Sequence, residues 1–245
     1  MDRSQLLILS EYLGVIAVSM LAGISPRLKK RPLIFKYPKR EGIIASSLLL
    51  VILVMNLIIY SQGFLTGNRL NLNNENSLLW ARLLISLFCL APFLVALYIR
   101  KQPLLSTGWN KNLLGSAIRL GIALVFLTIF LRGKIFSILN GITLEEGQAL
   151  LLWLGIAFSE ENIFRGYIQP RISAWTGDIP GWIITSVYFT VWHLPRILNS
   201  TEDIVLGLVF ILIQGLILGW LLRKSGHVLP NILYRSISEW LWFVM

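Results

Sequence analysis

The chain has 245 residues, of which 56% are hydrophobic and only 14% are charged. A soluble domain carries about 25% charged residues, so this composition excludes an ordinary water-soluble enzyme and a disordered chain. The formal charge of +10 does not indicate nucleic acid as a partner, because the basic residues lie mainly between long apolar runs. Positive charge in such loops fixes membrane orientation. The single cysteine, Cys89, excludes an intrachain disulfide and a cysteine metal site.

The apolar runs predict an all-α, polytopic transmembrane helix bundle of about eight spans. Each spanning helix needs roughly 20 apolar residues to cross the hydrocarbon core. The predicted spans are, in chain order, Leu6–Ile24, Gly42–Ser61, Leu78–Ile99, Leu113–Leu131, Ala149–Ile168, Gly181–Leu198, Ile204–Leu222 and Val228–Val244. We expect one membrane domain over residues 1–245, with the polar chemistry concentrated in residues 149–245.

Basic residues are distributed unequally between the two sets of loops. Thirteen fall on one side, namely Arg27, Lys29, Lys30, Arg31, Lys36, Lys39, Arg40, Arg100, Lys101, Lys111, Arg171, Arg223 and Lys224. Five fall on the other side, namely Arg3, Arg69, Arg132, Lys134 and Arg196. The positive-inside rule then predicts a cytoplasmic location for the first set and both termini outside, in a multi-pass protein of the plasma membrane. The first basic loop is also a candidate for contact with anionic lipid head groups.

Three ionisable residues stand together in the fifth predicted span. Glu161 and Arg165 are four residues apart, so they share one helix face and can form an ion pair. Glu160 points about 100° away and has no cation near it in the sequence. Ionisable side chains inside a span usually have a function or a partner. The spacing is equally compatible with a purely structural salt-bridge cluster and with Glu160 acting as a general base.

His193 lies near the end of the sixth predicted span, in an aromatic segment that includes Phe189. A single histidine in such a helix is more often a packing residue than a catalytic one. A carboxylate on a neighbouring helix changes this expectation, because a glutamate and a histidine around one water suffice for hydrolysis. The carboxylate takes the proton of the water, and the imidazole orients the water or stabilises the oxyanion.

The pattern Glu160-Glu161-x-x-x-Arg165 followed by Phe189-x-x-x-His193 resembles the first two motifs of the CAAX-protease and bacteriocin-processing (CPBP) family. Members of this family are intramembrane endopeptidases. The resemblance implies that Glu160 activates water, that Glu161 and Arg165 support it, and that His193 binds water or stabilises the oxyanion. It covers the chain from about Ala149 to the C-terminus.

The third family motif, His-x-x-x-Asn, can be placed in two registers. His227 and Asn231 match its letters. The surrounding glycine and proline favour the other register, in which Arg235 and Glu239 occupy these positions. Arg235 is always charged and only donates hydrogen bonds, so it could stabilise an oxyanion or neutralise Glu160. Because Arg235 and Glu239 are four residues apart, we expect them to pair and to leave Glu160 free.

Three functions follow as alternatives. The first is an intramembrane endopeptidase that hydrolyses a hydrophobic or lipidated peptide through water activated by Glu160. The second is a catalytically silent relative that binds a membrane partner, and the third is a small transporter, which lacks the repeat symmetry common in transporters. We expect membrane lipid as a partner and no dedicated metal site. A zinc ion would need three protein ligands and therefore Glu160 or Glu161 among them.

Overall fold

In a computed structural model, residues 3–24, 35–61, 75–198 and 203–244 are described, and within these ranges the chain forms helices joined by turns, without a strand. The α-helices are α1 (Arg3–Ile24), α2 (Pro38–Ser61), α3 (Glu75–Ile99), α4 (Leu114–Leu131), α5 (Ile135–Leu139), α6 (Leu144–Glu161), α7 (Gln169–Thr176), α8 (Asp178–Leu198), α9 (Ile204–Ser225) and α10 (Leu229–Trp240). Two 3-10 turns, η2 (Leu104–Thr107) and η3 (Lys111–Leu113), precede α4, and a π-helix, η4 (Asn162–Ile168), joins α6 to α7.

Five of these helices are long and apolar enough to cross a membrane, so the predicted helical membrane bundle is confirmed. They cover Gln5–Ile24, Pro38–Ser61, Asn76–Ile99, Lys111–Leu131 and Ile204–Ser225. The sides of these helices are rich in exposed apolar residues, such as Leu21, Val51, Tyr98 and Phe126, as expected of surfaces that contact lipid.

The remaining predicted spans correspond to α6 with the π-helix, to α8 and to α10. The eighth prediction was too long, because α10 has 12 residues and ends at Trp240. A helix of this length extends roughly 18 Å, which is less than the bilayer core of about 30 Å. The predicted external location of both termini depends on eight crossings and stays a prediction. Five of the counted basic residues, Arg27, Lys29, Lys30, Arg31 and Arg69, lie outside the described residues.

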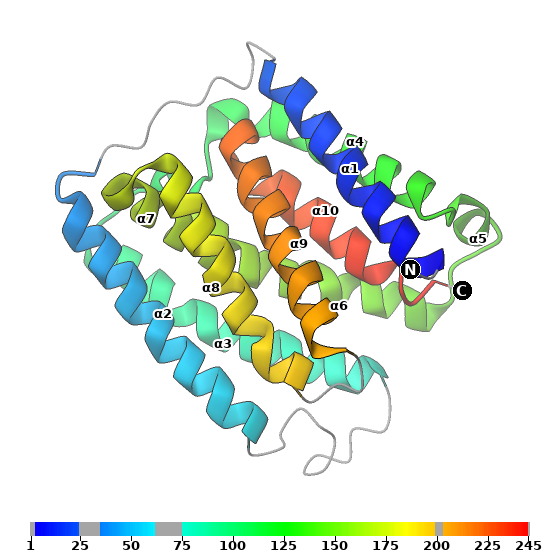
Figure 1. The fold of residues 1–245 in the computed structure, drawn as a ribbon, viewed down its shortest axis with the longest axis horizontal. Coiled ribbons are helices and arrows are strands. Elements are labelled where there is room, and N and C mark those ends of the chain that lie inside the picture. The colour runs from blue at the N-terminus through cyan, green and yellow to red at the C-terminus, as the bar shows by residue number, and fades with distance from the viewer. Residues whose placement is uncertain (1–2, 25–34, 62–74, 199–202, 245) are drawn as a thin grey trace.

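The helices that carry the motif residues occupy the interior of the bundle (Figure 1). Helix α10 packs between α4 and α6, while α8 packs against α9, α7 and α2. Helix α3 lies along α6, and α1 covers α4 and α9. A shared core that includes Leu49, Phe93, Phe164, Phe189 and Tyr234 connects these layers. The polar residues of α6, α8 and α10 therefore meet inside the protein.

Candidate functional site

The site begins at the C-terminal end of α6. Thr143 and Glu146 form a capping box that fixes the start of this helix. Glu160 and Glu161 are its last two residues, and the π-helix follows directly. Such wide turns recur at functional sites. Glu160 is 1% exposed and Glu161 is fully buried, so both carboxylates depend on partners inside the protein.

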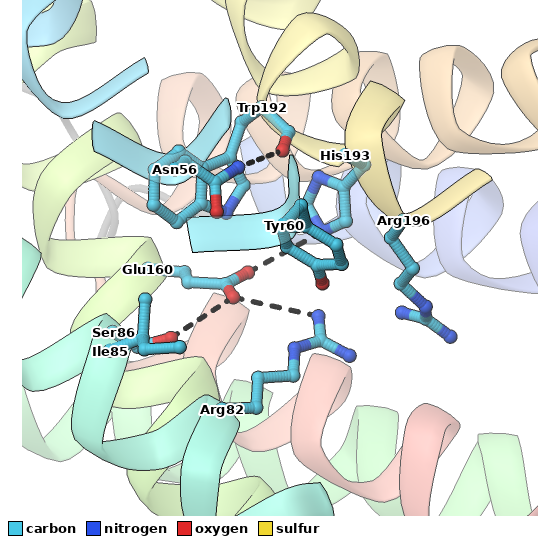
Figure 2. Close-up of a pocket in the computed structure, with 9 residues that line it drawn as sticks. All are labelled: Asn56, Tyr60, Arg82, Ile85, Ser86, Glu160, Trp192, His193 and Arg196. Atoms are coloured by element: carbon cyan, nitrogen blue, oxygen red, sulfur yellow. Dashed lines mark hydrogen bonds and ion pairs between the residues drawn. The ribbon is translucent and has the colours of Figure 1, made fainter. Parts of the chain in front are cut away.

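Glu160 is surrounded by polar side chains of α3, α8 and α10, of which Figure 2 draws those of α3 and α8. Its Oε2 atom forms an ion pair with Arg235, and its Oε1 atom accepts hydrogen bonds from Arg82 at 3.5 Å and from Ser86 Oγ at 3.3 Å. His193 Nε2 lies 3.5 Å from Glu160 Oε2. Glu160 therefore faces the bundle interior, and His193 lies within the span of one water from it.

The hydrogen bonds of His193 indicate where its proton lies. Nδ1 is 2.8 Å from the carbonyl oxygen of Phe189, and a carbonyl can only accept, so Nδ1 carries the proton. Nε2 of the neutral ring then presents a lone pair toward Glu160 Oε2, which is also an acceptor. Arg235 Nη2 lies 3.4 Å from His193 Nε2 and pairs with that same carboxylate oxygen. One guanidinium nitrogen therefore serves as the shared donor between the two acceptors.

Glu161 is held by three side chains. The predicted pair with Arg165 is confirmed, with 3.4 Å between Nη1 and Oε1, and Arg165 also donates to the carbonyl of Gly215 at 3.1 Å. Arg235 Nη1 lies 3.0 Å from Glu161 Oε1. Asn231 Nδ2 donates to Glu161 Oε2 at 3.4 Å. This carboxylate links α6, the π-helix, α9 and α10.

The expected pairing of Arg235 with Glu239 is wrong. Arg235 instead bridges Glu160 and Glu161, while Glu239 accepts a hydrogen bond from Gln214 Nε2 at 3.4 Å. The i, i+4 rule describes neighbours on an isolated helix. Here two buried carboxylates of α6 lie within reach of the same guanidinium, and pairing with them removes a larger desolvation cost.

Of the two registers for the third motif, the one that contains Arg235 reaches Glu160 and His193 in the structure. His227 lies apart, in the turn between α9 and α10, against the ring of Trp109. Its Nδ1 accepts the backbone N–H of Leu229 at 3.0 Å, at the start of α10. Burial lowers the pKa of His227 from its ordinary value. Asn231, the other residue of that register, reaches Glu161.

A cavity of about 20 Å³ adjoins Glu160 and His193, which is space for about one water. It is lined by Asn56, Tyr60, Arg82, Ile85, Ser86, Glu160, Trp192, His193 and Arg196 (Figure 2). The polar chemistry expected within residues 149–245 therefore extends further, because the wall of the cavity comes from α2 and α3 as well as from α6 and α8. Arg235 contacts Glu160 but does not line this cavity.

The cavity residues of α2 and α3 could not be recognised as site residues from the sequence. Arg82 was recognisable as a charge inside an apolar run, but its partner was not. Asn56 donates from Nδ2 to the carbonyl of Trp192 at 2.8 Å and joins α2 to α8. A single asparagine, serine or tyrosine in an apolar helix gives no signal of its position relative to Glu160.

The arrangement does not fit a metal ion. Among the residues that the structure describes, no group of three or more His, Cys, Asp or Glu side chains could hold one. The guanidinium of Arg235 lies between Glu160, Glu161 and His193, where it would repel a divalent cation.

Comparison with known proteins finds a family match for the C-terminal part of the chain. Residues 144–241 match the family model described as type II CAAX prenyl endopeptidase Rce1-like. No curated protein and no solved structure gives a significant match to the chain. The match includes all the motif residues and confirms the resemblance to the CPBP family.

Proposed function

We propose that this chain keeps the site of its matching family but does not hydrolyse peptides. Residues 144–241 match the Rce1-like CAAX prenyl endopeptidase family, whose members are intramembrane endopeptidases. In its native sequence the chain acts as a binding partner for hydrophobic or lipidated peptide segments within the plasma membrane. One observation carries the proposal: Arg235 Nη2 contacts both Glu160 Oε2 and His193 Nε2.

Hydrolysis needs a water that donates to the carboxylate while the imidazole orients it. In this site a nitrogen of Arg235 occupies the position between the two acceptors. Arg235 cannot give up its proton, so it can neither act as a nucleophile nor relay a proton to His193. It also neutralises Glu160, which weakens that carboxylate as a base.

Moving Arg235 aside would leave Glu160 and Glu161 with fewer cations. Breaking a buried pair costs about 3–5 kcal/mol, although Arg82 and Arg165 would retain part of the compensation. A barrier increase of that size slows a reaction by about 10²- to 10³-fold or more, at tenfold per 1.36 kcal/mol. The resting arrangement therefore favours the silent alternative.

Hydrolysis by a second route is the other candidate, and the water-sized cavity favours it. A water there would lie beside Glu160 and His193 without displacing Arg235, which lies outside the cavity lining. Arg82, which also lines the cavity, could then stabilise the oxyanion.

The test is cleavage of fluorescent membrane peptides, with and without a prenylated cysteine, by the purified protein in lipid nanodiscs. The native chain should give no product above background. The variant Arg235→His with Glu239→Asn restores the family's third motif and should cleave, and adding Glu160→Gln to it should abolish that product. Cleavage by the native chain that Glu160→Gln removes would overturn the proposal and support the cavity route.

A further inference from the structure

Three of the residues that line the cavity carry hydrogen-bond donors and come from three different helices. Tyr60 is the second-to-last residue of α2, Arg82 lies in the second turn of α3, and Arg196 lies two residues before the end of α8. Figure 2 shows these three side chains on the same side of Glu160. Their positions near helix ends place this part of the cavity toward one face of the bundle.

Arg196 is exposed and has no ion pair with a carboxylate of the described part of the chain. Arg82 is nearly buried, with 13% of its side chain exposed, and its contact with Glu160 is long at 3.5 Å. Glu160 gives its other oxygen to Arg235. Arg82 and Arg196 also repel each other electrostatically. Neither guanidinium is therefore fully compensated.

The charges of the described residues around the site do not balance. Glu160, Glu161 and Glu239 face four guanidinium groups, those of Arg82, Arg165, Arg196 and Arg235. With His193 neutral, one positive charge remains among the described residues of the site, and both Arg82 and Arg196 line the cavity. Arg82 is nearly buried and shares Glu160 with Arg235, and an incompletely compensated buried charge is costly, so a single negative charge beside Arg82 would stabilise this region.

We propose that Arg82 and Arg196, with the hydroxyl of Tyr60, bind the singly charged phosphate group of a membrane phospholipid. Guanidinium groups match the geometry of phosphate oxygens. Basic pockets between membrane helices bind lipid head groups. The cavity admits only a water-sized group, so the phosphate lies at its opening and directs one oxygen inward. This inference is independent of whether the site hydrolyses peptides.

The experiment titrates short-chain phosphatidylglycerol onto the detergent-solubilised protein and counts bound lipid by native mass spectrometry. Arg196→Gln removes one charged donor and should raise the dissociation constant by at least about tenfold, because hydrogen bonds to charged groups are among the stronger ones. Arg119→Gln is the matched control, because Arg119 is exposed on α4 and donates only to its own helix. It should change binding less than about twofold.

Two further measurements separate the sources of the anion. Displacement of the lipid by millimolar inorganic phosphate supports recognition of the phosphate group itself. Displacement by a peptide with a free C-terminal carboxylate, but not by phosphate, would overturn the assignment to lipid. Equal lipid affinity of the native protein and Arg196→Gln would overturn the site. Because Arg196 is exposed, this variant should fold, and Arg82→Lys provides a second variant that keeps the charge but loses the planar fork.

Discussion

Replacing Arg235 by methionine should strongly destabilise the protein. The substitution keeps a long side chain but removes both ion pairs, to Glu160 and to Glu161. Removing one partner of a buried pair costs about 3–5 kcal/mol. Arg82 and Ser86 still contact Glu160, and Arg165 and Asn231 still contact Glu161, so we expect a loss of about 3 kcal/mol, at the lower end of that range.

The free energy of unfolding can be measured by circular dichroism in mixed micelles with increasing sodium dodecyl sulfate. A double-mutant cycle with Glu160→Gln isolates the pair, because the neutral amide no longer needs a cation. The double variant should recover at least about 1.5 kcal/mol relative to additive losses. A loss below about 1 kcal/mol for Arg235→Met, or strict additivity, would refute the view that Arg235 is the main partner of Glu160.

Two further predictions concern the turns that position the site. Burial lowers the pKa of His227 in the folded protein. At a pH above the ordinary histidine pKa of about 6.5 the residue is neutral, and its contribution to stability is complete. This contribution is lost as the pH falls below that value. The unfolding free energy should therefore fall between pH 7 and pH 5 more steeply in the native protein than in His227→Gln. Equal slopes would contradict the lowered pKa of the buried His227. A Cβ added at Gly181 would lie 2.4 Å from Ser173 Cα. Gly181→Ala should therefore push α7 and α8 apart and lower the unfolding free energy by about 1–3 kcal/mol. An unchanged midpoint in the sodium dodecyl sulfate titration would argue against this close approach.

The motif residues of α6 and α8 could be predicted because their chemistry is visible within single helices. The pairing of Glu161 with Arg165 follows from helical spacing, and the approach of His193 follows from the resemblance to the family. The π-helix that continues α6 has no comparable signal, since Asn162–Ile168 could equally continue an α-helix.

The partner of Arg235 could not be predicted, because it depends on the distance between α10 and α6. Sequence spacing favours Glu239, yet two buried carboxylates on another helix compete more effectively. The same limit applies to Asn56, Tyr60 and Ser86. Each is an isolated polar residue in an apolar run, and only the packing of α2 and α3 against α8 and α6 brings it to the cavity.

The most direct test of the account is the cleavage assay in nanodiscs, applied to the native chain and to Arg235→His with Glu239→Asn. If Arg235 occupies the place of the attacking water, the native chain yields no product and the double variant yields product that depends on Glu160. Product from the native chain that disappears with Glu160→Gln would contradict the account.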